Sequence, residues 1–299
     1  MKKFVIVSDS CCDLPENIRK EFDVEYIPMR IHFNEKEYPA DLDWKDISFY
    51  DFYNLMREGV RIKTSQINSN EYFETFEKYI LDGCDVLSIS CASSLSSSYN
   101  GSLVARDELL KKYPDAKIVC IDSRNACFGL GTIVLTASKL RAEGKTIEEV
   151  QDFIETHKQE VNQLCTVESL TYLKRAGRVS AMSAVFGGLL QVKPIIISDI
   201  NGLNHAIEKV KGRKNSINRL IEMFKETYNE NAPYQKITVV HADVEEDAKM
   251  IKELLIPCVK EGTEIAIEKI GPIIGASTGP GTVAIYCYGK EVTVDGSKK

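Results

Sequence analysis

Seven serines lie between Ser88 and Ser98, and this density of hydroxyl groups is the first chemical feature of the sequence. A short apolar run at residues 86–89 is typical of a buried strand, and helical spacing of apolar residues resumes beyond Gly101. The serines are therefore expected on a turn that leads from a strand into a helix. Backbone N–H groups and a helix N-terminus converge at such a turn and favour an anion, and hydroxyls add uncharged donors. The sequence predicts an anion-binding turn, although one or two of these serines could serve only as helix caps.

Three further segments contain residues that could contact an anion or a ligand. Thr64 lies in a polar segment before a predicted helix, where its hydroxyl either completes a turn or meets Ser96. Arg175 and Arg178 lie in a basic loop, which is by default a solvated surface feature and alternatively an anion clamp or a docking surface for an acidic partner. The glycine-rich run at 275–281 is interpreted as a turn, or as a loop that approaches a ligand closely. It lacks the lysine that a nucleotide-binding P-loop requires.

The serine turn could also carry nucleophilic catalysis, because a serine becomes a nucleophile when a neighbouring base accepts its proton. Of the four histidines, only His241 follows a predicted strand directly. The sequence has no GxSxG motif of the α/β-hydrolases. His241 also fits the simpler role of ending a strand before the next helix. A serine-dependent acyl hydrolase that uses Ser96 and His241 is therefore the alternative function.

Composition excludes several classes of protein. The net charge of −6 argues against a nucleic-acid-binding face. No apolar run approaches the ~20 residues of a membrane span, and Asp9 interrupts the N-terminal apolar run too early for a signal peptide. Nine cysteines, without a CxxC pair or a zinc-type cluster, predict reduced thiols, no metal site and a cytoplasmic location.

Strands alternate with helices through the first half of the chain. Strands are predicted at 4–7, 24–33, 86–89 and 117–121, and helices at 44–56, 70–81 and 129–143. This alternation indicates a parallel α/β sheet, in which ligands bind at the carboxyl ends of the strands. Ser10, the serine turn and Asp122 all fall at such ends.

The pattern changes after about residue 160. Asn201-Gly202 is a strong hairpin signal, with the returning strand at 205–210. Further strands are predicted at 165–170, 237–241, 262–270 and 283–288, and helices at 217–228 and 245–255. These features predict an α+β domain with an antiparallel sheet. We therefore expect an N-terminal α/β domain over residues 1–160 and a C-terminal α+β domain over residues 161–299.

Several short motifs follow one another in a characteristic order. They are Asp9-Ser10, Asp13-Leu14-Pro15, Lys63-Thr64-Ser65-Gln66, the serine turn around Leu95-Ser96, Lys174 to Ser180, His241-Ala242-Asp243 and Gly279-Pro280-Gly281. With these motifs the chain resembles the DegV family of bacterial fatty-acid-binding proteins over nearly its whole length. Three positions depart from the family pattern: Ile67 stands where proline is usual, Ser97 where glycine is usual, and Ser277 where histidine is usual. Ser97 and Ser277 lie in the segments expected at the ligand. Both are predicted to contact the ligand.

The resemblance implies a long-chain fatty acid buried between the two domains, with its carboxylate held by Thr64 and Ser96. It also implies a non-catalytic carrier for a fatty-acid kinase. A separate ATP-binding subunit would phosphorylate the bound carboxylate to an acyl phosphate for phospholipid synthesis. Arg175 and Arg178 would contact that partner or the phosphate.

The fatty acid is thus the expected ligand, and no cofactor is expected. The apolar stretch at 184–192 is a candidate wall for the acyl tail, although core packing explains it almost equally well. Contact with membranes, if any, is expected to be transient.

Overall fold

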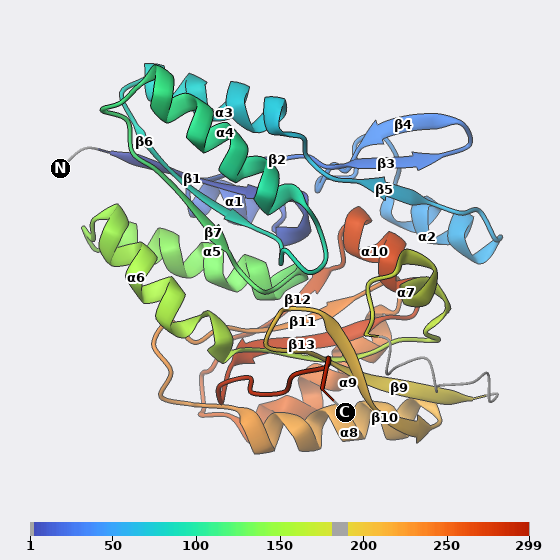
Figure 1. Cartoon of the computed structure of the whole chain (residues 1–299). Coiled ribbons are helices and arrows are strands. Elements are labelled where there is room, and N and C mark those ends of the chain that lie inside the picture. The colour runs from blue at the N-terminus through green and yellow to red at the C-terminus, as the bar shows by residue number, and fades with distance from the viewer. Residues whose placement is uncertain (1–2, 181–190, 299) are drawn as a thin grey trace.

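The computed structural model describes residues 3–180 and 191–298, which form two stacked sheets with helices around and between them (Figure 1). The N-terminal half builds the upper sheet in this view and the C-terminal half builds the lower one. A small third sheet lies beside the upper one. Within the described parts of the chain, no helix has the length and apolar character needed to cross a bilayer.

The first sheet has four parallel strands in the order β2-β1-β6-β7. The strands are β1 (Phe4–Asp9), β2 (Val24–Ile27), β6 (Asp85–Ser90) and β7 (Ile118–Asp122). The helices around it are α1 (Glu16–Glu21), α3 (Ser69–Leu81), α4 (Ser98–Lys112), α5 (Cys127–Ala142) and α6 (Ile147–His157). Helices α3 and α4 cover one face, and α5 covers the other (Figure 1). The predicted parallel α/β sheet is confirmed.

The second sheet has six strands in the order β10-β9-β8-β13-β11-β12. The strands are β8 (Val161–Thr166), β9 (Val192–Ser198), β10 (Asn204–Lys211), β11 (Ile237–His241), β12 (Ile265–Lys269) and β13 (Val283–Tyr288). Helices α8 (Arg213–Thr227) and α9 (Glu245–Leu255) cover the face that points away from the first sheet (Figure 1). Neighbouring strands are antiparallel except β11 and β12, which are parallel. The expected antiparallel sheet is therefore present, and the β11–β12 pair makes it mixed.

Helix α5 lies between the two sheets and packs against both of them. It contacts β1 and β6 on one side and β8 and β13 on the other. Thirteen of its 16 residues are buried, so it has no polar face. One apolar core therefore runs from the first sheet through α5 to the second sheet, and a separate core lies under α8 and α9. The domain boundary near residue 160 stays a prediction.

The third sheet differs from the sequence-based expectation. It joins β4 (Lys36–Pro39), β3 (Arg30–Phe33) and β5 (Lys63–Ser65), with α2 (Phe49–Arg57) following β4 in the chain. The single strand expected at 24–33 is wrong, because β2 and β3 belong to different sheets. Pro28 lies between them and has no N–H to continue a ladder. The polar segment around Thr64, expected to be a turn, is the edge strand β5.

Two segments expected to be loops are short helices, α7 (Thr171–Ala176) and α10 (Pro272–Thr278). Single turns of 3₁₀-helix also occur among the described residues, at η1 (Ser10–Cys12), η2 (Lys158–Glu160) and η4 (Ile256–Cys258). Gly275 is needed within α10 because a Cβ there would lie 2.4 Å from the Tyr53 hydroxyl. Tyr53 also donates a hydrogen bond to the Ile270 carbonyl at 3.0 Å. The expectation of a glycine-rich turn is wrong at 275–278, because these residues belong to helix α10. Gly275 is small because Tyr53 packs closely against it, and not because the backbone needs a conformation that only glycine adopts.

Candidate functional site

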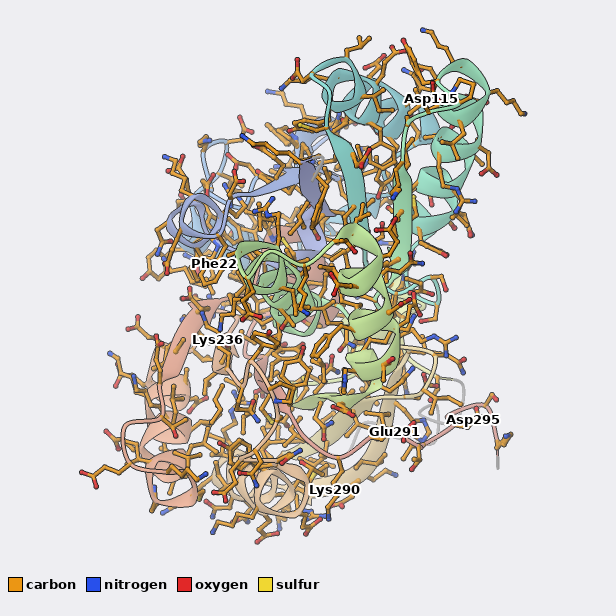
Figure 2. All side chains as sticks on the ribbon, turned by 90° about the vertical axis from the view of Figure 1, so that its left-hand side faces the viewer. Phe22, Asp115, Lys236, Lys290, Glu291 and Asp295 are labelled. Carbon is orange, nitrogen blue, oxygen red and sulfur yellow. The ribbon has the colours of Figure 1, made fainter. Side chains whose placement is uncertain are left out.

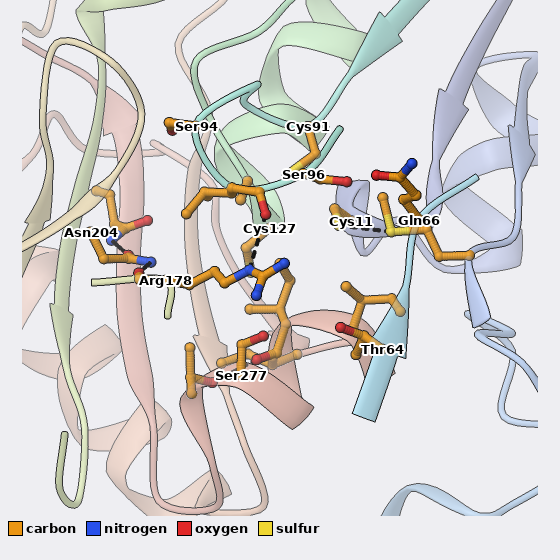
Figure 3. Close-up of a pocket in the computed structure, with 18 of the residues that line it drawn as sticks. Cys11, Thr64, Gln66, Cys91, Ser94, Ser96, Cys127, Arg178, Asn204 and Ser277 are labelled. Carbon is orange, nitrogen blue, oxygen red and sulfur yellow. Dashed lines mark hydrogen bonds between the residues drawn. The ribbon is translucent and has the colours of Figure 1, made fainter. Parts of the chain in front are cut away.

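A cavity of about 490 Å³ lies between the two sheets (Figure 3). The N-terminal half contributes the turn after β6, strand β5 and the 3₁₀ turn η1. The C-terminal half contributes residues of β8, β13 and α10. The turn after β6 and η1 follow the carboxyl ends of parallel strands, where a ligand site is expected in such a sheet.

The serine turn forms one side of this cavity, and Ser96 and Ser97 both line it. Ser98 starts α4 and is buried, and its hydroxyl lies 3.0 Å from the Ser96 hydroxyl. Ser93 is held by the Asp122 carboxylate through its hydroxyl at 2.6 Å. Ser97 has φ −81°, so the position where the family usually has glycine needs no left-handed backbone here. The turn is therefore held at both ends, while Ser96 and Ser97 face the cavity.

Thr64 reaches the same cavity from β5. The chain that follows β5 is fixed to the serine turn, because the Ile67 N–H donates a hydrogen bond to the Ser98 hydroxyl at 3.2 Å. One buried hydroxyl, that of Ser98, thus contacts both the segment that carries Thr64 and the neighbouring Ser96. Both hydroxyl-bearing residues proposed to hold a carboxylate lie on the wall of one cavity, and that role stays a proposal.

Ser277 and Arg178 line the cavity from the C-terminal half. Ser277 lies near the end of α10 and is half-buried. The Arg178 side chain extends between the serine turn and Ser277, and its Nε donates to the Leu95 carbonyl at 3.1 Å (Figure 3). Arg175 does not line this cavity but a smaller one next to it.

The remaining walls are mainly apolar groups and thiols. They include Met29, Leu95, Ala126, Ile270, Ile273, Ile274 and Ala284, together with the thiols of Cys11, Cys91, Cys127 and Cys165. Burial raises the pKa of the Cys127 thiol well above its ordinary value and that of Cys165 to about 12, so both thiols stay neutral and act as small apolar groups. The Tyr286 hydroxyl donates to Gln163 at 3.2 Å. Most of these residues lie in ordinary strands and helices, so the sequence holds no signal that marks them as cavity walls.

Residues 184–190, which make up most of the candidate tail wall at 184–192, lie outside the described residues. Whether they contact the cavity stays a prediction.

The hydrolase alternative finds no support in this geometry. His241 does not line the cavity, and its Nδ1 accepts a hydrogen bond from the Val244 N–H at 3.3 Å. Its ring packs edge-on against Phe49, and burial lowers its pKa, which keeps the ring neutral. The hydrogen bonds of the Ser96 hydroxyl are to Ser98, so no base activates it. In the described part of the chain, no cluster of three or more potential metal ligands occurs.

Asp13 lies behind the Cys127 wall and is the most unusual ionisable group near the cavity. It is buried, and neither carboxyl oxygen has a hydrogen-bond partner of normal geometry. Burial raises its pKa to about 7, although the neighbouring Cys127 thiol and Gly271 N–H oppose the shift. The folded protein therefore holds this proton more tightly than the unfolded chain does. Stability should fall as pH rises from the unfolded pKa near 4 to about 7, and the full cost should remain above that pH.

We therefore expect Asp13→Asn to gain stability relative to the wild type as pH rises. Between about pH 5 and pH 8 the difference in unfolding free energy should shift by roughly 2 kcal/mol in favour of the variant. Thermal melts of both proteins across this range measure the shift. Asp115→Asn is the control, because Asp115 is exposed at the far end of the N-terminal half (Figure 2). Parallel melting curves for Asp13→Asn and the wild type at every pH would contradict the assignment.

The family model for uncharacterised proteins of the DegV family matches residues 3–290. The chain belongs to the DegV family. A DegV domain-containing protein of Clostridium perfringens is 40% identical over 290 residues, which cover 97% of this chain and 98% of that protein. Another from Caldanaerobacter subterraneus is 32% identical over 286 residues, covering 96% of this chain and 99% of that one.

Solved structures of DegV proteins share the whole fold. DegV of Bacillus subtilis, described as a fatty acid binding protein, is 30% identical with a TM-score of 0.81, covering 96% of this chain and 100% of that one. A DegV lipid binding protein of Thermotoga maritima is 26% identical with a TM-score of 0.84, and the match covers 97% of this chain and 100% of that one. A stearic-acid-binding protein of Eubacterium ventriosum is 25% identical with a TM-score of 0.84, and the match covers 96% of this chain and 98% of that one. Proteins with this fold, a DegV protein among them, are thus described as binding fatty acids or lipids.

Proposed function

We propose that this DegV protein binds a long-chain fatty acid in the cavity between its two sheets, with the carboxylate at Thr64 and Ser96. The observation that carries the proposal is the composition of the cavity wall. The serine turn and β5 bring uncharged hydroxyls to this wall, Ser277 adds one from the C-terminal half, and apolar side chains with neutral thiols make up most of the rest. A ligand with one anionic end and a long apolar tail matches such a wall, and the fatty-acid-binding descriptions of DegV relatives support it.

The energetics explain why the head group matters. Burying about twelve methylenes at ~0.8 kcal/mol each gives about 10 kcal/mol relative to water. A bilayer solvates the tail equally well, so this contribution nearly cancels when the protein extracts a fatty acid from a membrane. Each hydroxyl that donates to the carboxylate adds roughly 1.5–3 kcal/mol. The hydroxyls at Thr64 and Ser96 therefore favour the protein over the membrane.

We further infer that the protein is a non-catalytic carrier that presents the carboxylate to a separate ATP-binding kinase subunit. Neutral donors hold a carboxylate without neutralising it, so its oxygens remain nucleophilic toward a phosphoryl group. The product would be an acyl phosphate for phospholipid synthesis.

We also propose that the protein is cytoplasmic. All nine cysteines are free, as expected for a cytoplasmic protein, and contact with membranes would be limited to lipid exchange.

Mass spectrometry of lipid extracted from the purified protein tests the first part. We expect a fatty acid in near-stoichiometric amount, and uptake of added long-chain fatty acid after the protein has been delipidated. Recovery of no fatty acid, together with no uptake of the added one, would rule out the proposal. For the second part, labelled ATP should yield acyl phosphate only when a kinase subunit is also present. Turnover by this protein alone would show that it is itself an enzyme.

A further inference from the structure

Two cysteine side chains on the cavity wall contact each other. Cys11 lies in η1, just after β1, and Cys91 directly follows β6, the neighbouring strand of the first sheet. Both residues line the cavity between the sheets (Figure 3), and both thiols are free. The two side chains share a hydrogen bond. Thiols in contact at the ends of adjacent strands can be joined by a disulfide with little movement of the backbone.

The carboxylate of Asp9 holds these two cysteines in place. Its Oδ1 accepts a hydrogen bond from the Cys11 N–H at 2.9 Å, and its Oδ2 accepts one from the Cys91 N–H at 2.7 Å. The Cys11 thiol also hydrogen-bonds to this carboxylate and lies 3.6 Å from the Met29 sulfur. Burial raises the pKa of Asp9 to about 6, so the carboxylate is ionised at neutral pH. A buried anion beside a thiol can accept the thiol proton when the sulfur attacks.

The surroundings of this thiol pair select the oxidant. The hydrogen bond with Cys91 and burial raise the pKa of Cys11 well above its ordinary value, so little thiolate forms. Each of the two cysteines is only 2% exposed, and an oxidant dissolved in water would therefore react slowly. An oxidant bound in the cavity would instead be held at a high local concentration. A hydroperoxide of an unsaturated fatty acid combines a tail that the cavity accepts with a weak O–O bond.

We propose that a fatty-acid hydroperoxide bound in the cavity oxidises Cys11 and Cys91 to a disulfide and is itself reduced to the hydroxy fatty acid. The Cys11 sulfur attacks the terminal peroxide oxygen, the O–O bond breaks, and Asp9 passes the thiol proton to the leaving alkoxide. Cys11 then carries a sulfenic acid. The Cys91 sulfur attacks the Cys11 sulfur, the S–O bond breaks, and the hydroxyl leaves as water with the Cys91 proton.

Two thiols and one hydroperoxide thus give one disulfide, one alcohol and one water. Each chain reacts once, until an external dithiol reduces the disulfide. The position of the lipid rests on the function proposed above.

The test mixes the delipidated full-length protein with one equivalent of linoleic acid hydroperoxide. We expect the hydroxy acid in an amount equal to the protein and the loss of two of the nine free thiols. Peptide mass spectrometry should locate the disulfide between Cys11 and Cys91. Hydrogen peroxide at the same concentration should oxidise the pair at least about tenfold more slowly, because the cavity does not hold it. Equal rates for the two oxidants, a disulfide between other cysteines, or no oxidation would each overturn the proposal.

Single variants separate the roles of the two thiols. Cys11→Ser should reduce the hydroperoxide at least about tenfold more slowly, because it lacks the attacking sulfur. Cys91→Ser should still reduce it but stop at a sulfenic acid on Cys11, which dimedone traps. The control Cys84→Ser/Cys258→Ser removes the two cysteines that are not buried and do not line this cavity, and should react like the wild type.

An unchanged rate in Cys11→Ser, or a lost reaction in the control, would contradict the assignment. Alanine replaces serine in any variant that does not fold, and the disulfide map of the wild type depends on no variant.

Cumene hydroperoxide separates this proposal from the fatty-acid proposal. It is a small apolar hydroperoxide without a carboxylate, so it can enter the cavity even if no fatty acid binds. A protein that binds no hexadecanoate yet forms the disulfide with cumene hydroperoxide would keep the redox pair and lose the fatty-acid function. A protein that binds hexadecanoate but forms the disulfide with neither organic hydroperoxide would lose the redox pair alone.

Discussion

Replacing Thr64 and Ser96 together by alanine is expected to lower the affinity for a long-chain fatty acid by roughly a hundredfold or more. Both hydroxyls lie on the wall of the inter-sheet cavity, and each should donate to the carboxylate. Their removal leaves an anion at an apolar surface without its donors, which is the costly case for a buried charge. Titration of the delipidated variant with a fluorescent fatty acid measures the loss.

The fold should survive this double substitution. The bond that ties the β5 segment to the serine turn runs from the Ile67 N–H to the Ser98 hydroxyl, and neither group is altered. The matched control is Thr64→Ser, which keeps a donor and loses only a methyl group. It should bind within about threefold of the wild type. Undiminished binding by the double alanine variant would show that the carboxylate lies elsewhere.

Ala284→Phe is expected to weaken the binding of long chains strongly. Ala284 lies on β13 beside its strand partner Cys165 of β8, is buried, and lines the cavity. A phenyl ring there occupies space that the tail needs. Excluding about four methylenes at ~0.8 kcal/mol each costs roughly 3 kcal/mol, or about a hundredfold in affinity.

A series of fatty acids from octanoate to octadecanoate provides the measurement for Ala284→Phe. The preferred chain should become shorter in the variant, and Ala284→Val should show a smaller shift in the same direction. A chain-length profile identical to that of the wild type would place the tail outside this cavity. A melting temperature near that of the wild type is the required control, because overpacking a strand also destabilises a fold.

The two main sheets were predictable because their strands and turns have local signals. The buried run of β6, the helix spacing of α3 and the Asn201-Gly202 hairpin each depend on neighbouring residues. The third sheet had no such signal, since β3, β4 and β5 are short and only tertiary pairing makes them strands. Helix α10 was not predicted for a related reason. Glycine lowers the local stability of a helix, so the sequence indicated a turn, but tertiary contact with Tyr53 outweighs that cost.

The candidate site was predictable only in part. The serine turn was identified from its composition, Thr64 and Arg178 from their polar and basic segments, and Ser277 from the family resemblance; the structure brings all of them to one cavity. The cavity thiols and the apolar wall residues of α10 and β13 were missed. Each of these is an unremarkable residue in its own segment, and its significance arises only when distant segments meet in space. Arg175, expected to contact the partner or the phosphate, lines the neighbouring cavity, and its role stays a prediction.

The position of α5 limits how such a protein can have been assembled. Since this helix packs against both sheets, separating the halves would uncover the inner face of the second sheet and the side of α5 that packs on it. A gene fragment encoding one half would yield a chain with a wide apolar surface open to water, prone to aggregate. Recombination between relatives within this region would tend to be lost, and the two halves are expected to be inherited together.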